Sequence, residues 1–307
     1  MANQQEIEAI YDWLDFFQEL RLGKCADTTA AFFDGDFSKT LSEAQNDKHD
    51  WVFEGVGIDG PGKRILDIGC GWGPTLKAIK EQGGGGLGLT LSRAQARYCQ
   101  REGFDARVVD WKEVDPKALG TFDAVISIGA FEHFCSEEEY NRGQQPQIYE
   151  RFFDLCADLL PAGGKMFLQT MTWGKQIPVA ADIRLDAPEG TPGRILARMR
   201  KFYPGSWPPS GKDQIVAAAS KRFRFLKSSN GRKDYIETLN RWGEGTDSLW
   251  KAPKIYKAIP AILRLIPRYA VDRDFRIQIS SLRHNDQQVC FIEEIMSHER
   301  IFFEKLS

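Results

Sequence analysis

The chain has 307 residues, of which 42% are apolar and 27% are charged, and its formal net charge is -2. It contains no apolar run of roughly 18 residues, so no membrane span is expected. The near-neutral charge argues against a general affinity for nucleic acid, which requires a strongly basic surface. The start, "MANQQEIEAIYDWLDFF", lacks the features of a secretory signal, so we expect a cytoplasmic protein. The six cysteines form no CxxC pair, so neither a metal site nor a disulfide framework is expected.

Short apolar runs alternate with amphipathic stretches between residues 64 and 170. Five of the runs have the length and apolar character of buried parallel strands: 64–69, 86–91, 106–109, 122–129 and 164–171. Three of the intervening stretches have helical spacing: 74–82, 92–103 and 149–164. This alternation predicts a doubly wound α/β sheet.

The segments on either side of this core are less regular. Residues 172–222 carry six prolines, too many for regular sheet and typical of a segment that covers a site. We predict four segments of one domain: an N-terminal helical cap segment over 1–60, the α/β core over 61–171, a covering insertion over 172–222, and two final strands, 223–230 and 299–307, with inserted helices over 223–307.

The sequence "ILDIGCGWG" places Asp67, Gly69, Gly71 and Gly73 on the turn after the first predicted strand. Glycine is needed where a backbone bends sharply and approaches a ligand. An acid just before the glycines would repel the pyrophosphate that the usual dinucleotide fingerprint binds, but it suits a ligand with cationic groups. S-adenosylmethionine carries an ammonium and a sulfonium, so we expect this cofactor in the core.

The motif D-x-G-x-G-x-G in this position resembles that of the class I S-adenosylmethionine-dependent methyltransferases. The segments "GLGLTLSRAQ" and "SIGAFEHF" narrow the resemblance to the cyclopropane fatty acid synthase and mycolic acid methyltransferase family. So do "YDWLDFFQELRLG", "TLSEAQNDKHDW", "FYPGSWPPS" and "DYIETLNRW", which extend the similarity over nearly the whole chain. The resemblance implies a methyltransferase with a mostly parallel, seven-stranded, Rossmann-like sheet and a helical cap.

The resemblance also implies a set of cofactor contacts. Thr90 and Gln95 correspond to a pair that holds the ribose, and Asp110 and Trp111, in "VDW", to the segment that packs on the adenine. The predicted cofactor site is completed by Thr28, Thr29, Leu91 and Ile128, although the family has a Tyr-Ser pair in place of the two threonines. The alternatives are ordinary strand and helix-surface roles for Thr90 and Gln95, and a core or surface indole for Trp111.

Glu132 and His133 follow the fourth predicted strand, at the edge where open α/β sheets bind ligands. We expect both to face the methyl donor; the alternatives are an ion pair for Glu132 and a core imidazole for His133. In the family's mycolic acid enzymes a Cys, a Glu, a His and a Tyr hold a bicarbonate ion. This chain matches the Glu with Glu132 and the Tyr with Tyr235, but it has Ala30 at the Cys position and Gln169 at the His position.

This difference bears on the expected reaction. Closing a cyclopropane ring requires a base that removes a proton from the new methyl group, whereas transfer to a carboxylate oxygen requires only an acceptor held in line and kept dry. We therefore predict simple methyl transfer, such as O-methylation of a fatty acid carboxylate, with Glu132, His133, Tyr235 and Gln169 as the catalytic residues. Cyclopropanation or C-methylation of an unsaturated acyl chain stays open, with the Gln169 amide positioning bicarbonate.

The expected acceptor is a fatty acid or a related lipid. Its hydrocarbon chain would lie beneath "IPAILRLIP" in a pocket lined by six aromatic residues, each of which is individually also a plausible core residue: Phe16, Phe17, Phe32, Phe33, Trp173 and Phe202. Between residues 194 and 233, eleven Lys or Arg occur with one acid. This stretch either forms a solvated face or attracts a fatty acid carboxylate, an acyl carrier or a membrane surface. Methylation of a small secondary metabolite and a non-catalytic scaffold also stay open.

Overall fold

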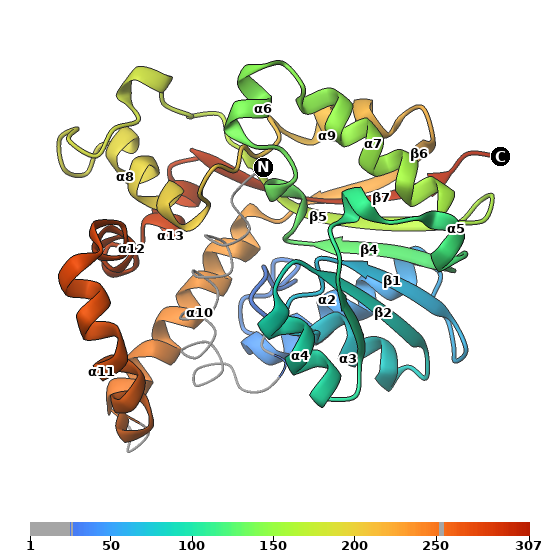
Figure 1. Cartoon of the computed structure of the whole chain (residues 1–307), viewed down its shortest axis with the longest axis horizontal. Coiled ribbons are helices and arrows are strands. Elements are labelled where there is room, and N and C mark those ends of the chain that lie inside the picture. Colours follow the sequence, from blue (N-terminus) through green and yellow to red (C-terminus); the bar gives the residue numbers. More distant parts are fainter. Residues whose placement is uncertain (1–24, 26, 252–254) are drawn as a thin grey trace.

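Seven strands form one sheet in the order β3-β2-β1-β4-β5-β7-β6 in the computed structural model, which describes residues 25, 27–251 and 255–307 (Figure 1). The strands are β1 (Arg64–Ile68), β2 (Gly85–Thr90), β3 (Asp105–Val108), β4 (Ala124–Ile128), β5 (Lys165–Trp173), β6 (Phe223–Asn230) and β7 (Met296–Lys305). The strands β1 to β5 pair in parallel, whereas β7 runs antiparallel to both β5 and β6. The predicted doubly wound, mostly parallel, seven-stranded sheet is therefore confirmed.

The two edges of the sheet differ from its centre. One edge is β3, a strand of four residues, and the other is β6. The register between β6 and β7 shifts between Phe225 and Lys227, so that the edge strand carries a bulge.

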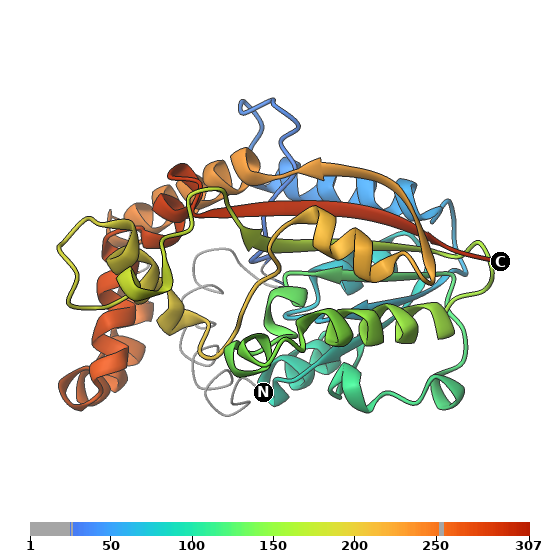
Figure 2. The same cartoon turned by 90° about the horizontal axis from the view of Figure 1, so that it is seen from above.

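Helices cover both faces of the sheet (Figure 2). Because successive strand residues point to opposite faces, Ile65 packs with α2 (Leu41–Val56), α3 (Pro74–Glu81) and α4 (Arg93–Arg101), whereas Leu66 packs with α7 (Gln145–Asp158) and α9 (Lys212–Ala219). The short helix α5 (Pro116–Leu119) lies on the second face through Leu119. The two resulting apolar clusters hold the strands in place.

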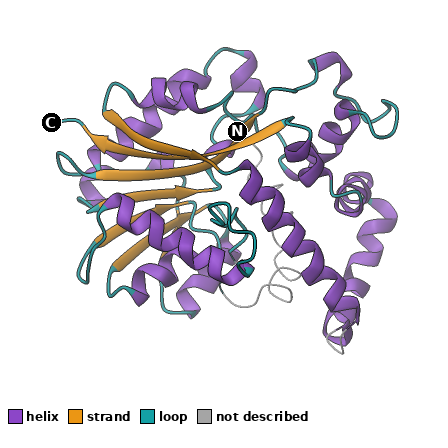
Figure 3. Ribbon diagram, turned by 180° about the vertical axis from the view of Figure 1, so that it is seen from behind, coloured by secondary structure: helices purple, strands orange, loops and turns teal. Residues whose placement is uncertain are grey.

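A group of helices lies at one end of the sheet, beyond the end of β5 (Figures 1 and 3). It consists of α8 (Pro192–Met199), α10 (Arg232–Lys251), α11 (Ile255–Val271), α12 (Arg273–Arg283) and α13 (Asp286–Ile292). This is the predicted helical cap, although α2, from the predicted N-terminal cap segment, packs on the sheet face instead. Within the described residues, no helix has both the length and the apolar character that a bilayer crossing demands.

Five short helices connect these elements: α6 (Glu137–Asn141) and the 3₁₀ helices η1 (Trp111–Glu113), η2 (Phe131–His133), η3 (Ala180–Asp182) and η4 (Arg200–Phe202). The covering segment predicted over 172–222 contains η3, α8, η4 and α9. Its second half therefore returns to the sheet, since α9 packs on the face that α7 covers. The division of the chain into four segments remains a prediction.

A buried guanidinium joins the cap to the sheet. Arg300, on β7, is fully buried and lies 2.6 Å from the carboxylate of Asp234, on α10. Its second nitrogen donates to the carbonyl of Ala31 at 2.5 Å, and its Nε donates to Oε1 of Gln169, on β5, at 3.4 Å. One side chain thus fixes a sheet strand, a cap helix and the segment around residue 31 relative to one another.

Replacing Arg300 with Met tests this connection. Because Asp234 would stay buried without its partner, we expect Arg300→Met to lower the free energy of unfolding by about 3 to 5 kcal/mol. Arg224→Met is the matched control, since Arg224 forms a solvent-exposed pair with Glu304. Urea denaturation measures both, and equal effects of the two substitutions would contradict the structural role of Arg300.

Candidate active site

The glycine turn lies between β1 and α3, where the strand order reverses between β1 and β4. Ligands of open α/β sheets bind at this switch point. Gly69 has a φ of 90° and leaves no room for a side chain, because a Cβ there would lie 2.3 Å from Cβ of Ala130. Gly71 has a φ of 52°, and a Cβ there would meet no atom within 4 Å. Gly71 therefore borders open space, whereas Gly69 and Gly73 are needed for local packing.

Asp67 lies at the end of β1, directly before this turn, and is almost fully buried. Its Oδ2 has no hydrogen-bond partner among the described residues. Burial raises the pKa of Asp67 to about 7, although a hydrogen bond from Thr75 opposes the shift. A cationic ligand would restore the ordinary ionised state, so this residue fits an ammonium or sulfonium group.

Thr90 and Gln95 lie beside each other after β2. Both are buried, and the Thr90 hydroxyl donates to Oε1 of Gln95 at 2.7 Å. The Nε2 of Gln95 has no hydrogen-bond partner within the described part of the chain, so it can donate to a hydroxyl of a ligand. Leu91 is half-buried and follows Thr90, and Ile128 is buried at the end of β4. Their contacts with the cofactor remain predictions.

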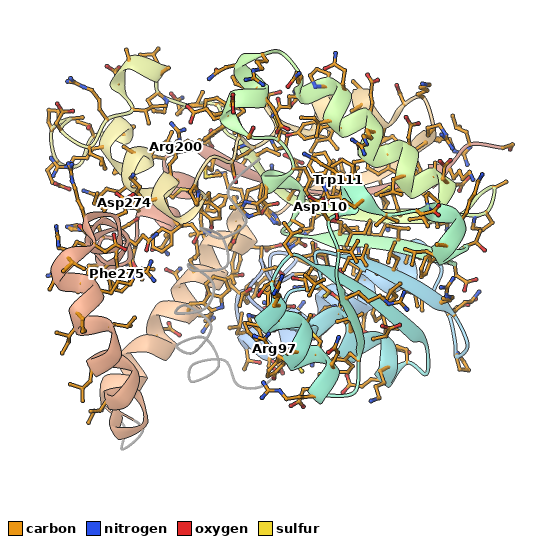
Figure 4. The ribbon with its side chains drawn as sticks, viewed as in Figure 1. Arg97, Asp110, Trp111, Arg200, Asp274 and Phe275 are labelled. Carbon is orange, nitrogen blue, oxygen red and sulfur yellow. The ribbon has the colours of Figure 1, made fainter. Side chains whose placement is uncertain are left out.

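Asp110 and Trp111 lie at the start of η1, near the middle of the molecule (Figure 4). The Asp110 carboxylate accepts from the backbone N–H of Lys112 at 2.9 Å and so caps η1. The Trp111 indole is buried against Phe134 and Phe152, with ring centroids 5.1 and 5.4 Å away. The indole is thus part of the core, and a contact with adenine stays a prediction.

The two threonines lie on an irregular segment from residue 27 to residue 31, which bends at Thr29. Thr28 is half-buried, and the methyl group of Thr29 lies against Gly129, at the end of β4. The Thr29 hydroxyl donates to Asp27 and accepts from Lys48, each at 2.7 Å. This hydroxyl therefore anchors the segment to α2, in addition to any role toward a ligand.

That anchor is a buried charge cluster which sequence reasoning missed. Lys48 is fully buried and lies 2.5 Å from the Asp27 carboxylate, and Nε2 of His49 lies 3.1 Å from it. Burial opposes ionisation of Asp27, but the charge of Lys48 and the His49 hydrogen bond prevail and hold its pKa well below its usual range. In the sequence, "QNDKHD" has the composition of a solvated helix face, so no local signal predicts this burial.

Glu132, on η2, is buried beside β5. Its Oε2 accepts a hydrogen bond from the Thr170 hydroxyl at 2.8 Å. Burial raises the pKa of Glu132 to about 7, although backbone groups of Glu132 and Met171 and the Thr170 hydroxyl oppose the shift. The predicted alternative of an ion pair is absent among the described residues, since none of the salt bridges there includes Glu132. A carboxyl group with this pKa can accept or release a proton near neutrality.

A group of polar side chains lies on the cap side of Glu132. Nδ1 of His133 lies 2.9 Å from the Ser206 hydroxyl, and its ring stacks on Tyr203 with centroids 5.4 Å apart. Burial lowers the pKa of His133 to about 4, so the imidazole is neutral at physiological pH. The Tyr235 hydroxyl accepts from Nε2 of Gln287, on α13, at 3.2 Å. None of Ser206, Tyr203 and Gln287 was predicted as a site residue, although Tyr203 and Ser206 lie in the segment "FYPGSWPPS" that carries part of the family resemblance.

Gln169 and Ala30, the two positions that depart from the family's bicarbonate site, contact each other. Nε2 of Gln169 donates to the Ala30 carbonyl at 3.2 Å, and its Oε1 accepts from Arg300 at 3.4 Å. Gln169 is 1% exposed and Ala30 is fully buried. Both ends of this amide are therefore used by the protein itself.

The predicted hydrocarbon pocket is only partly found. Trp173 belongs to a buried apolar cluster under the cap, together with Met171, Ile195, Leu196, Met199, Trp242 and Phe291. Phe32 instead stacks on Trp51, and Phe33 packs with Ala31 and Ala44, so neither belongs to this cluster. Phe202 is half-buried on η4 and outside this cluster, and Phe16 and Phe17 lie outside the described residues.

The segment "IPAILRLIP" does not cover this cluster with the side chains that the structure describes. Ile259, Leu263 and Ile266 of α11 are 47%, 59% and 55% exposed. They lie on one face of the helix, at i, i+4 and i+7, and this face is turned to solvent. The prediction that these residues roof the pocket is therefore wrong.

The basic stretch from 194 to 233 is largely neutralised within the chain. Seven of its eleven cations form ion pairs with acids elsewhere: Arg194, Arg198, Arg200, Lys201, Arg222, Arg224 and Arg232. This arrangement favours the solvated-face interpretation over a single site for an anionic partner.

Two features define the class of this protein. One is the seven-stranded sheet with its antiparallel strand β7, and the other is the buried acid beside the glycine turn at the switch point of this sheet. The protein is a class I S-adenosylmethionine-dependent methyltransferase. Asp67, the open space at Gly71 and the Gln95 amide fit the cationic and hydroxyl groups of S-adenosylmethionine, which supplies the methyl group when bound.

Comparison with known proteins identifies the family. The sequence profile of the mycolic acid cyclopropane synthetases matches residues 1–258, so the chain belongs to this family. It is 30% identical over 254 residues to the S-adenosylmethionine-dependent methyltransferase UmaA of Mycobacterium tuberculosis, covering 80% of this chain and 82% of UmaA. It is 33% identical over 258 residues to cyclopropane mycolic acid synthase 3 of the same organism, covering 79% and 82%. The crystal structure of mycolic acid cyclopropane synthase CmaA1 with SAH and CTAB has 26% identity and a TM-score of 0.74, covering 99% of this chain and 98% of CmaA1.

Gly71→Ala tests the position of the cofactor. We expect it to weaken S-adenosylmethionine binding at least about tenfold, because the added Cβ enters the open space beside the turn. Gly62→Ala is the matched control, since Gly62 also has a positive φ, 81°, and open surroundings, but it precedes β1. Isothermal titration calorimetry measures both; equal affinities for the two variants would show that the ligand lies elsewhere.

Proposed function

We propose that this methyltransferase moves a methyl group to a carboxylate oxygen of a fatty acid or a related lipid and closes no cyclopropane ring. The observation that carries the proposal is the hydrogen bond from the side-chain amide of Gln169 to the carbonyl of Ala30. Two of the proteins compared above are named for cyclopropane synthesis, and a bicarbonate site in this chain would need ligands at these two positions. Ala30 offers only a methyl group, and the side-chain amide of Gln169 is already hydrogen-bonded to Ala30 and Arg300.

The remaining polar residues suit transfer to an oxygen. A carboxylate is already a nucleophile, so the site needs to hold it in line with the donor at about 3 Å and exclude water. Burial in an apolar site raises the pKa of the acceptor's own carboxyl group, and that group must lose its proton before it reacts. Glu132, with a pKa of about 7, is matched to take this proton.

The apolar cluster under the cap supports a lipid acceptor. Met171, Trp173, Met199 and Trp242 are all buried next to Tyr235. An alkyl chain that separates these side chains would gain about 0.8 kcal/mol for each methylene group removed from water. An acyl carrier or a membrane surface as a further partner has less support, because most cations of the basic stretch are already paired.

Product analysis tests the proposal. Wild-type protein with S-adenosylmethionine is offered palmitate, oleate and a long-chain amine, and the products are analysed by mass spectrometry before and after alkaline hydrolysis. We expect palmitate and oleate to gain a methyl group that hydrolysis removes, because an ester is cleaved and a ring or branch is not. A product from oleate alone that survives hydrolysis would instead show cyclopropanation or C-methylation, and N-methylation of the amine would also contradict the proposal.

We expect the substitution Glu132→Gln to lower turnover and to increase the free energy of unfolding near neutral pH. The variant should bind S-adenosylmethionine normally and lose most turnover, because an amide cannot take the acceptor's proton. The pKa of Glu132 rises from 4.5 to about 7, so the folded state of the wild type loses stability as the pH rises through this window. The glutamine variant lacks that loss. Its free energy of unfolding, relative to that of the wild type, should therefore increase by on the order of 3 kcal/mol between about pH 4 and about pH 8. Urea denaturation and S-adenosylhomocysteine release measure the two effects; unchanged turnover would return Glu132 to a structural role.

A further inference from the structure

We propose that Thr170 is a positioning residue of the candidate active site, whose hydroxyl holds the carboxyl group of Glu132 in place while that group takes up and releases a proton. Thr170 lies on β5, directly after Gln169, and is fully buried. The inference rests on the proposed function, in which Glu132 accepts the proton of the acceptor, and it adds the residue that controls Glu132.

The strand β5 continues beyond the end of its neighbour β4. The parallel register between the two strands ends at the pair of Ile128 and Gln169, whereas β5 extends to Trp173. The helix η2 lies beside this continuation, where the Thr170 hydroxyl donates to Oε2 of Glu132 at 2.8 Å. The backbone of Met171 also supports the Glu132 carboxylate. The part of β5 that β4 leaves unpaired is therefore the part that holds Glu132.

The Thr170 hydroxyl has two acceptors within reach. Besides the Glu132 carboxylate, it reaches the backbone carbonyl of Met171 at 3.2 Å. A hydroxyl carries one hydrogen and two lone pairs, so it donates to one acceptor at a time and can also accept. When Glu132 is ionised, the hydroxyl hydrogen points to the carboxylate. When Glu132 is protonated, its own O–H group donates to the Thr170 oxygen, and the hydroxyl hydrogen turns to the Met171 carbonyl.

Both protonation states of Glu132 are thus hydrogen-bonded without movement of a heavy atom. A buried polar group that loses its partner is costly, so without this hydroxyl the carboxyl group would gain by reorienting whenever its charge changes. The bond to the ionised form is the stronger one, because charge-assisted hydrogen bonds are roughly twice as strong as neutral ones. Thr170 therefore lowers the pKa of Glu132, in opposition to burial.

The other titratable groups around Glu132 do not supply a partner charge. On α7, burial raises the pKa of Tyr149 far above its usual range, so the phenol is neutral. On η2, burial lowers the pKa of His133 to about 4, and the neutral ring stacks on Tyr203. In the segment before α2, the carboxylate of Asp27 is paired with Lys48. Among the described residues, hydrogen-bond donors rather than an ionic partner thus stabilise the charge of Glu132.

The experiment compares Thr170→Val with Thr172→Val. Valine keeps the branched shape of threonine but has no hydroxyl. Thr172 is also fully buried on β5, and its hydroxyl donates to the carbonyl of the next residue, Trp173, at 3.3 Å, as that of Thr170 does to Met171. The pKa of Glu132 is measured by NMR from its carboxyl carbon, in protein that contains carbon-13-labelled glutamate and is loaded with S-adenosylhomocysteine. Glu132→Gln identifies the signal, and melting temperatures verify that each variant is folded.

We expect Thr170→Val to raise the pKa of Glu132 by about one pH unit and Thr172→Val to leave it unchanged. Thr170→Ser, which restores the hydroxyl, should return the pKa to the wild-type value. Turnover of Thr170→Val at pH 7 should fall about fivefold, because the ionised fraction of Glu132 falls from about one half to about one tenth. Equal titrations of Glu132 in the two valine variants, or a serine variant that titrates like Thr170→Val, would overturn the inference.

Product analysis keeps this test separate from that of the proposed function. If Thr170→Val shifts the titration of Glu132 but wild-type protein forms no methyl ester from palmitate, only the proposed function is contradicted. If wild-type protein forms the ester and its turnover has the same pH dependence as that of Thr170→Val, the positioning role is overturned.

Discussion

The guanidinium of Arg300 is the group on which the arrangement of the site depends. It lies in the interior of the protein, on the antiparallel strand β7, and its three contacts reach α10, the segment that precedes α2, and β5. An unpaired charge in this position would be too costly to keep, so the cap helix and the N-terminal segment must both be in place. The same contact engages the Gln169 amide. The constraint that joins the cap to the sheet therefore also occupies the amide oxygen of Gln169, a predicted catalytic residue.

Two acids in the site share a property that the rest of the fold maintains. Asp67 lies at the end of β1, Glu132 lies on η2 after the neighbouring strand β4, and burial raises the pKa of each to about 7. Oδ2 of Asp67 has no hydrogen-bond partner among the described residues, and Glu132 is the residue that we propose to exchange a proton with the acceptor. Such groups destabilise a protein that has nothing to bind, and the apolar clusters on both sheet faces offset this cost. In the proposed function, binding of the donor and of the acceptor would reduce this cost.

The sequence predicted the sheet well, because runs such as "RILDIG" and "FDAVISIG" are too apolar to lie anywhere but in a core. It also predicted a cofactor site at the glycine turn, since this turn is a local motif whose function follows from backbone geometry, and that placement stays a prediction. It could not reveal which charges are buried: Lys48 and Arg300 look like surface residues until the fold surrounds them. Tyr203 and Gln287 are distant in sequence and meet only through the packing of α13. The sequence also led to the wrong prediction that the exposed face of α11 is buried, because the apolar character of a helix face does not determine which elements pack against it.

The bulged edge strand β6 has a consequence for how copies of this protein meet. Between Phe225 and Lys227 the strand loses its regular register, and the exposed Lys227 places a positive charge on this edge strand. A second molecule that tried to extend the ladder would encounter mismatched donors and acceptors together with like charges. The opposite edge, β3, offers only four residues. Both edges of the sheet therefore disfavour edge-to-edge association of newly made chains into fibrils. This protection requires no change at the end of the sheet where the candidate site lies.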